Sequence, residues 1–442
     1  MTMKRLDLLI HHFTNTNPWW FIGLGAAVRL VFVIAFCLTT RWINYAPLIG
    51  PSSMETGVDG YIQIARTLLT SGEYALEPGS APVPFRPPVQ PVLMAAFGAW
   101  SPVYWYIVWL AFAVTLGTAT LWLLWKCARL VDLPPAMTRL LILAVAVHPY
   151  LVFATRVPGI PPAMIFMTTL LLFGVLSFAR SKGKHPVITG VLWGAAALTH
   201  GCFLPLFFPT LVFLTMTLRG PWRERLKKSS LMAMATILMI APWTLRNRIT
   251  FNQWIPVATG GGLQYWIADY TYFGNRDEGG VFKHIASEFE NRHGRKLQIV
   301  HGGILNLADD AELVHEAKAQ IFAQPSILAR RALIGSLLFW TTMDGGLRKA
   351  MIISIMSLPL ILLGLGLGVA VIAKKAWSVD FGLAALLLLE FWGLFALVQA
   401  VGPYFLAITP CLMFLIALSL DLLNRQRTRS SGLLDSAKLS TL

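Results

Sequence analysis

The sequence predicts an all-α polytopic membrane protein, a bundle of about ten or more transmembrane helices. Of its 442 residues, 56% are hydrophobic and 13% are charged, whereas a soluble domain has about a quarter charged residues. Several stretches run for about 18 or more residues with almost no charge, the length that a helix needs to cross the hydrocarbon layer. The formal net charge of +15 comes from Lys and Arg at the ends of these stretches. The positive-inside rule explains this placement, so we expect no nucleic-acid partner.

Ten apolar stretches are expected to be spans when sides are assigned in alternation. They lie near 20–38, 103–125, 140–154, 163–179, 187–198, 203–218, 231–243, 351–373, 382–399 and 405–423. With the N-terminus in the cytoplasm, every short basic loop then falls on the cytoplasmic side. Residues 88–100 and 327–340 are apolar but short, and counting either one alone would move later basic loops outside. We therefore expect both to be interfacial or re-entrant.

Residues 1–442 are expected to form a single transmembrane domain. Residues 41–102 form a first outer, periplasmic loop, residues 245–342 form a large one, and residues 425–442 form a basic cytoplasmic tail. The four cysteines are scattered in or beside apolar runs, so we predict no disulfide framework. No HExxH, HxH or Cys/His grouping occurs, so we predict neither a metal site nor a cofactor.

Asp59 precedes a short amphipathic segment in the first outer loop. Its apolar residues follow the spacing of a helix that lies on a surface, and they are Tyr61, Ile64, Ala65, Leu68 and Leu69. Gln63, Arg66 and Thr67 are expected on the other face, and Gly72 is expected to end the helix. Two interpretations of Asp59 remain open: it accepts backbone N–H groups as a helix cap, or it is partly desolvated and acts as a general base.

Arginines at the outer ends of spans are candidates for binding phosphate. Arg86 precedes Pro87 and Pro88, so its backbone is stiff and extended, and its planar fork fits a phosphate. Arg246 and Arg248 follow the seventh span on the outer side, against the positive-inside bias, and lipid phosphates would explain them. The alternatives are interface arginines that extend their heads into water and a solvated loop.

The large outer loop adds further positive charge, which suggests an anionic lipid or sugar-phosphate ligand. These residues are Arg276, Lys283, Arg292, Arg295, Lys296, Arg330, Arg331 and Arg348. Inside the predicted spans, Arg29 and Glu390 are charged, which is costly in hydrocarbon. We expect them to pair with each other or with another structural partner.

The order of these features resembles the polytopic glycosyltransferases of the GT-C class. The similarity is to members grouped with dolichyl-phosphate-mannose–protein mannosyltransferases and the lipid A aminoarabinose transferases. It rests on the Asp59 helix followed by "RPPVQP", on "VITGVLWGAAALTHGCFLPLFFP", on "PWTLRNRITFNQWIPVATGGGLQYW" and on "PYFLAITPCLMFLIAL". Together these motifs touch most of the chain.

The resemblance implies a GT-C-like bundle with amphipathic interfacial helices in the first outer loop. It also implies an inverting transfer of a sugar from a polyprenyl-phosphate donor at the periplasmic face of the bacterial inner membrane. The acceptor would be lipid A, a polysaccharide, a glycolipid or a protein, and membrane lipids surround the bundle. Asp59 matches the catalytic acidic residue, and Arg86 and Arg246 match the residues that hold the donor phosphate. Tyr404 matches the last motif and is assigned to the substrate pocket with Tyr61 and His200.

Two positions depart from the family pattern. Gly60 stands where many relatives have a second acid, so we predict metal-independent catalysis. Pro403 stands where the family usually has arginine, so Arg248 or Arg156 is expected to help hold the phosphate. Two alternative functions are considered: a lipid or sugar transporter or flippase, and an O-antigen ligase or polymerase. The first would place charges and broken helices at mid-membrane and often shows two related halves, whereas the polar residues here gather at one interface.

Overall fold

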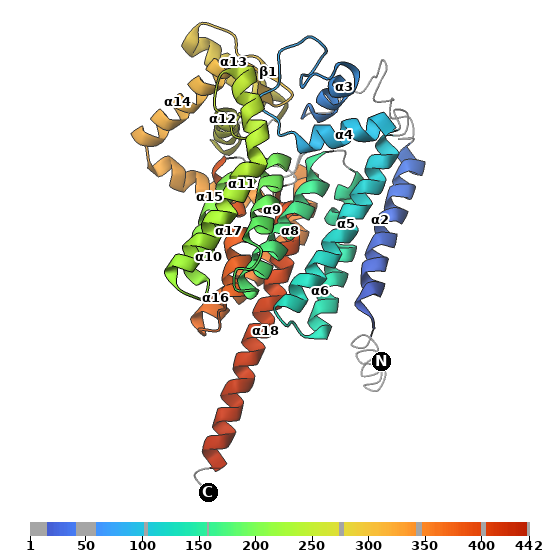
Figure 1. The fold of residues 1–442 in the computed structure, drawn as a ribbon, viewed down its shortest axis with the longest axis vertical. Coiled ribbons are helices and arrows are strands. Elements are labelled where there is room, and N and C mark those ends of the chain that lie inside the picture. The colour runs from blue at the N-terminus through green and yellow to red at the C-terminus, as the bar shows by residue number, and fades with distance from the viewer. Residues whose placement is uncertain are drawn as a thin grey trace.

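The computed structural model describes residues 16–40, 59–100, 105–156, 159–273, 278–341, 347–398 and 404–439. They form a bundle of long helices with a layer of shorter elements at one end (Figure 1). The bundle contains α2 (Pro18–Thr40), α5 (Trp105–Leu130), α6 (Pro135–Val147), α7 (Pro149–Phe153), η2 (Ala154–Arg156), α8 (Ile160–Arg180), α9 (Pro186–Thr199), α10 (Phe203–Thr217), α11 (Trp222–Phe251), α16 (Leu347–Ala373), α17 (Val379–Val398) and α18 (Tyr404–Leu439).

The layer at one end of the bundle is built from both outer segments of the chain. It contains α3 (Tyr61–Ser71), α4 (Val89–Trp100), α12 (Gly261–Phe273), α13 (Glu278–His293), α14 (Leu307–Ala323), α15 (Ser326–Thr341) and the antiparallel hairpin of β1 (Ile299–Val300) and β2 (Gly303–Ile304). We call it the loop-end layer, its side of the bundle the loop end, and the opposite side the basic end.

A bundle helix stands at each of the ten positions where the sequence predicts a span. Among the described residues, six helices are long and apolar enough to cross a membrane, namely α2, α5, α8, α11, α17 and α18. A seventh span results if α6 is joined to α7 and η2 across a bend of 51°. The chain is therefore a multi-pass, all-α membrane protein. α9 and α10 have 14 and 15 residues, so at about 1.5 Å per residue they are shorter than the hydrocarbon layer of roughly 30 Å.

The bend between α6 and α7 accounts for the buried charge of Arg29. Pro149 begins α7 and has no N–H, so the carbonyl of Val145 loses its helical donor. Arg29 is 2% exposed, and its guanidinium donates to the carbonyl oxygens of Val145 and the next residue, at 3.5 and 3.1 Å. Glu390 accepts a hydrogen bond from Thr210 at 3.0 Å. Each charge has a structural partner, and the two do not pair with each other.

Gly190 and Gly194 allow α9 to pack directly on α11. A Cβ built on Gly190 would lie 2.2 Å from the carbonyl oxygen of Met232, and one on Gly194 would lie 2.5 Å from Cβ of Met239. At the same contact, the hydroxyl of Thr236 donates to the carbonyl of Gly190 at 3.0 Å. The spacing of Gly190 and Gly194 therefore allows the close packing that small residues make possible between membrane helices.

The turns between bundle helices meet at the basic end. Lys228 of α11 donates to the carbonyl of Lys182, which follows α8, and Arg425 of α18 donates to the carbonyl of Asp132, which follows α5. These contacts bring the predicted basic loops together, and Figure 1 shows them opposite the loop-end layer.

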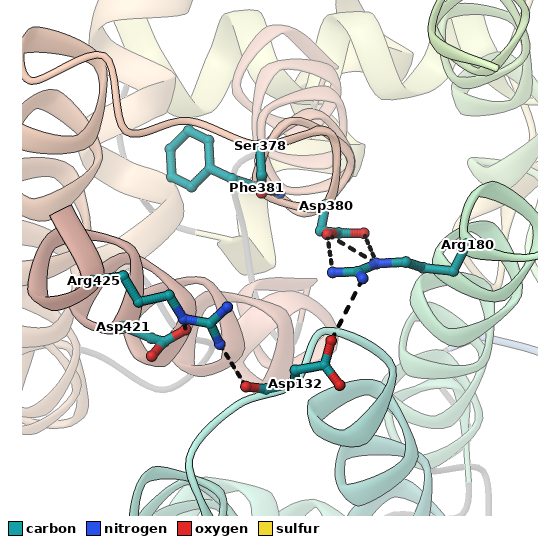
Figure 2. Close-up of polar contacts among 7 residues, drawn as sticks. All are labelled: Asp132, Arg180, Ser378, Asp380, Phe381, Asp421 and Arg425. Carbon is teal, nitrogen blue, oxygen red and sulfur yellow. Dashed lines mark hydrogen bonds and ion pairs between the residues drawn. The ribbon is translucent and has the colours of Figure 1, made fainter. Parts of the chain in front are cut away.

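An ion-pair network stabilises the basic end (Figure 2). Arg180, the last residue of α8, binds both carboxylate oxygens of Asp380 in the first turn of α17, with Nη2 2.7 Å from Oδ2. Its Nη1 lies 3.6 Å from the carboxylate of Asp132. Arg425 pairs with Asp421 one turn earlier in α18, at 2.7 Å. Both arginines therefore face carboxylates, and the network connects α8, α17, α18 and the α5–α6 turn.

Two apolar clusters organise the loop end. One is internal to the large outer segment and is formed by Leu263, Ile267, Val281, Ile285, Phe289, Leu297, Ile304 and Leu313. The other joins both outer segments to α11 and is formed by Ile64, Tyr74, Leu76, Val83 and Phe85, with Trp243, Val300 and Leu305 packed against them. The backbone N–H of Thr259 also donates to the carbonyl of Pro84 at 3.0 Å. These contacts place the first outer segment beside the end of α11.

Candidate functional site

α3 places Asp59 at the loop end, and its ends are set by two glycines. Gly72 has a φ of 76° and donates its N–H to the carbonyl of Leu68, so the predicted stop is confirmed. Gly60 has a φ of 74° and occupies the N-cap position. Thr67 was expected on the polar face but is 1% exposed, because its hydroxyl donates to the carbonyl of Leu76. The buried face of α3 packs on protein instead of lipid. It contacts α4 and the apolar cluster that joins both outer segments to α11.

Asp59 lies just before the N-cap, and its carboxylate contacts an arginine. Its Oδ1 is 3.8 Å from Nη2 of Arg86, and the side chain is 51% exposed. Because Gly60 holds the N-cap position, the described residues do not support the capping interpretation. About half of the side chain is exposed, so the carboxylate is only partly removed from solvent. An exposed carboxylate beside a cation is accessible to an incoming hydroxyl group.

Arg86 is held rigidly at the centre of this region. Its Nε donates to the backbone carbonyl of Asp59 at 2.6 Å, and its Nη2 donates to the carbonyl of His301 at 2.8 Å. The guanidinium also lies over the rings of Tyr61 and Phe85, at 5.3 and 5.1 Å from their centroids. Within the described part of the chain, its third nitrogen, Nη1, makes no hydrogen bond. The side chain is 14% exposed and keeps a fixed orientation.

The turn of the β1–β2 hairpin covers Arg86, which the sequence does not predict. His301 and Gly302 form this turn with φ values of 49° and 67°. A Cβ on Gly60 would lie 3.1 Å from Cβ of His301, and one on Gly303 would lie 2.2 Å from the ring of Phe85. The close approach therefore requires glycine on both sides. The only signal in the sequence is the pair of glycines after His301, which marks a turn but not its position against the first outer loop.

Arg246 lies in an aromatic setting next to the Arg86 segment. Its guanidinium carbon is 5.1 Å from the ring centroid of Tyr74 and 4.9 Å from that of Trp243. The hydroxyl of Tyr74 donates to the backbone carbonyls of Arg86 and Pro87, at 3.0 and 2.9 Å. Burial raises the pKa of Tyr74, so it stays a neutral donor. Tyr74, which the sequence analysis did not single out, thus separates and positions the two arginines.

His200, Tyr404 and Tyr61 lie in the same region. The rings of His200 and Tyr404 are 5.8 Å apart, and Tyr404 stacks on Phe395 at 4.0 Å. The guanidinium of Arg86 lies 5.3 Å from the ring centroid of Tyr61. Leu198, two residues before His200, packs in one cluster with Val89, three residues after Arg86. Burial raises the pKa of Tyr61, which is 3% exposed. The structure therefore brings together five of the predicted residues: Asp59, Arg86, Tyr61, His200 and Tyr404.

The remaining two arginines predicted at the site have contacts of their own. Arg248 donates to the carbonyl of Asn252 at the end of α11 and lies 5.7 Å from the ring of Trp254. Arg156 lies over the rings of Phe153 and Phe36, at 3.9 and 5.1 Å, in the corner formed by α2, α7 and η2. Arg248 lies near Arg246 on α11, whereas Arg156 contacts a different corner of the bundle. Pro403 lies outside the described residues.

Some of the other basic residues of the large outer segment are already neutralised. Three of them pair with carboxylates of the same segment: Arg292 with Glu316, Arg295 with Asp309, and Arg331 with Asp269. The broader expectation is therefore wrong for these three residues. Sequence reasoning could not separate them from Arg246, because their partners lie 14 to 62 positions away in the chain.

The loop end consequently brings arginines that have no close carboxylate partner near the accessible carboxylate of Asp59. Among the described residues, Arg246 and Arg248 form no ion pair, and Arg86 has one long contact with Asp59. Such a set can bind an anionic group and accept a proton from a hydroxyl beside it. No three His, Cys, Asp or Glu side chains in the described ranges are grouped to hold a metal ion.

The fold is similar to that of a solved glycan-transferring enzyme. The chain superposes on an oligosaccharyltransferase from Archaeoglobus fulgidus with a TM-score of 0.54 and 14% sequence identity. The match covers 94% of this chain and 52% of the other, so this chain spans about half the length of that enzyme. No protein-family model and no curated protein sequence matches the chain. The comparison supports the GT-C-like fold that the resemblance implied.

Proposed function

We propose that the protein is an inverting glycosyltransferase whose active site lies at the loop end. Its donor is a sugar on a polyprenyl phosphate, and the loop end faces the periplasm of a bacterial inner membrane. The observation that carries the proposal is that the arginines there are not neutralised: among the described residues, Arg246 and Arg248 form no ion pair, and Arg86 contacts one carboxylate, that of Asp59, at 3.8 Å. The shared fold with an oligosaccharyltransferase supports the same reaction class.

Asp59 is the general base in this proposal. Its carboxylate takes the proton from an acceptor hydroxyl, and the hydroxyl oxygen attacks the anomeric carbon of the donor sugar. The bond from that carbon to the phosphate oxygen breaks, and its electron pair leaves with the polyprenyl phosphate. One displacement inverts the anomeric centre. The 51% exposure of Asp59 gives an acceptor access to the carboxylate.

The arginines stabilise the leaving phosphate. Negative charge grows on the phosphate oxygens as the sugar departs, and guanidinium groups that are already oriented interact more strongly with that charge than with the ground state. Arg86 is oriented by two backbone carbonyls and Arg246 by the rings of Tyr74 and Trp243. Arg248, on the same helix as Arg246, adds positive charge.

The acceptor is a hydroxyl of lipid A, a polysaccharide, a glycolipid or a protein in this proposal. The lipid-linked donor follows from the position of the site, because a nucleotide sugar made in the cytosol would not reach the outer interface. The surrounding membrane lipids hold the prenyl chain beside the bundle, with its phosphate at the level of Arg86 and Arg246.

The test is release of polyprenyl phosphate by purified protein in lipid vesicles. The protein receives polyprenyl-phosphate sugars one at a time, together with an envelope extract as acceptor. We expect release with at least one donor, and transfer of its sugar to a hydroxyl with inverted configuration. Movement of the intact donor across the bilayer without release would instead indicate a flippase. Release from pyrophosphate-linked donors alone would indicate a ligase-like enzyme.

A further inference from the structure

His200 follows α9 at the loop end, and its imidazole is oriented by its own loop. The backbone N–H of Cys202 donates to Nδ1 of His200 at 3.3 Å. The loop is fixed by two further bonds, from the N–H of His200 to the carbonyl of Ala196 and from the N–H of Phe203 to the carbonyl of His200. The imidazole therefore has a defined direction without any contact from a substrate.

The bond from Cys202 determines which ring nitrogen carries the proton. A backbone N–H always donates, so Nδ1 must be the unprotonated acceptor, and the proton of the neutral ring is on Nε2. Burial lowers the pKa of His200 to about 3, and the positive charge of Arg86 adds to this effect. The ring is thus a neutral Nε2–H donor at neutral pH.

Nε2 has no hydrogen-bond partner in the described part of the chain. The known contacts of the ring are the Cys202 bond at Nδ1 and the aromatic neighbours Tyr404 and Phe395, at 5.8 and 6.5 Å. Leu198, two residues before His200, packs in one cluster with Val89, three residues after Arg86, so the loop of His200 lies beside the segment that carries Arg86. A fixed donor without an acceptor beside an arginine fits an anionic oxygen.

From this geometry, and on the basis of the proposed function, we infer that Nε2–H of His200 donates a hydrogen bond to a phosphate oxygen of the polyprenyl-phosphate donor. Arg86 supplies charge to that phosphate, and His200 supplies a neutral bond of fixed direction. A neutral donor beside a cation adds a phosphate ligand without adding charge repulsion when the site is empty. This division of roles gives a partly buried histidine a function near the Arg86 segment.

Three variants distinguish the hydrogen bond from Nε2–H from the aromatic packing of the ring. His200→Phe keeps the aromatic contact with Tyr404 but removes both nitrogens. His200→Asn keeps an acceptor near the Nδ1 position for the N–H of Cys202, and His200→Gln places an amide N–H near the Nε2 position. We expect kcat for release of polyprenyl phosphate to fall about 10²-fold in the Phe and Asn variants. The Gln variant is expected to recover at least tenfold over Phe.

His284→Phe is the matched control. His284 also packs on a tyrosine, with its ring 4.6 Å from Tyr270, but it lies in α13 of the large outer segment. We expect wild-type kcat for this variant. If the wild-type protein turns over donor and His200→Phe does so at the same rate, the inference is overturned while the proposed function stands.

A spectroscopic measurement tests the inference independently of turnover. In protein labelled with ¹⁵N-histidine, the His200 signal is assigned by its loss in His200→Phe. We expect the proton on Nε2 from pH 5 to pH 9, and a shift of that nitrogen when polyprenyl phosphate is added. A proton on Nδ1, or an Nε2 signal that polyprenyl phosphate leaves unchanged, overturns the inference. A wild-type protein that binds polyprenyl phosphate but releases none from any donor removes the proposed function alone.

Discussion

The two ends of the bundle use arginine in different ways. At the basic end, Arg180 and Arg425 face three carboxylates, those of Asp132, Asp380 and Asp421 (Figure 2). At the loop end, Arg86 faces backbone carbonyls and aromatic rings and Arg246 faces aromatic rings, and the nearest carboxylate is 3.8 Å from Arg86. Arg180 and Arg425 are therefore paired with carboxylates without any ligand, whereas Arg246 forms no ion pair among the described residues and Arg86 has only one long contact.

This difference separates structural from functional charge. An arginine that pairs with a buried carboxylate has no attraction left for an anion, and its removal leaves the carboxylate uncompensated. An arginine held by carbonyls and rings is oriented but not neutralised, so an arriving phosphate meets its full charge. Basic residues at the two ends should therefore respond differently to substitution. The following predictions test that contrast.

The largest expected effect is loss of turnover on substitution of Asp59. Asp59→Asn keeps the shape of the side chain but removes the base, so kcat should fall about 10²–10⁴-fold. Because the carboxylate is 51% exposed, the melting temperature should stay at the wild-type value. Release of polyprenyl phosphate and thermal melting are measured on the same preparation. Full activity in this variant would show that Asp59 is not the base.

Substitution of Arg86 is expected to lower both stability and turnover. Arg86→Ala removes the donors to the carbonyls of Asp59 and His301, so the two outer segments lose a shared contact. We expect a loss of about 2 kcal/mol in the free energy of unfolding and a fall of about 10²–10³-fold in kcat. Arg86→Lys cannot reach both carbonyls and should recover only part of either quantity. Wild-type turnover in Arg86→Ala would contradict the phosphate role.

At the basic end, substitution should change stability and leave turnover intact. Asp380→Asn removes a carboxylate that is 9% exposed and doubly bonded to Arg180, and the expected loss is about 2 kcal/mol, since Arg180 is partly exposed. Asp132→Asn is the control, because that carboxylate is 76% exposed at 3.6 Å and should matter by less than about 1 kcal/mol. Chemical unfolding in detergent measures the free energy of unfolding of both variants. Equal losses would show that burial does not distinguish the pairs.

The smallest expected effect is a pH dependence of stability from His200. Its pKa is about 3 in the folded protein and about 6.5 in an unfolded chain, so the unfolded state binds more protons between these values. Stability should therefore fall as the pH drops below about 6.5, by on the order of 1 kcal/mol per pH unit, relative to His200→Phe. Thermal melting at pH 7, 6 and 5 compares the two proteins. Parallel curves would mean that His200 titrates normally.

Much of the fold could be predicted from the sequence, because charge alternation and apolar length locate a helix at each of ten positions. The direct packing of α9 on α11 could not, since the contact between Gly190 and the backbone of α11 depends on tertiary structure. At the site, the cluster of Asp59 and Arg86 follows from residues close together in the chain. The covering turn at His301 and the pairing of Arg331 with Asp269 join distant residues, and composition does not specify such pairings.

The most direct measurement is the affinity of polyprenyl phosphate for two arginine variants, one from each end. Arg246→Ala removes a guanidinium that forms no ion pair among the described residues, and Arg425→Ala removes one that pairs with Asp421 at 2.7 Å. We expect the dissociation constant to rise at least tenfold for Arg246→Ala and to stay at the wild-type value for Arg425→Ala. Equal weakening in both variants, or none in either, would contradict the assignment of the loop end as the phosphate site.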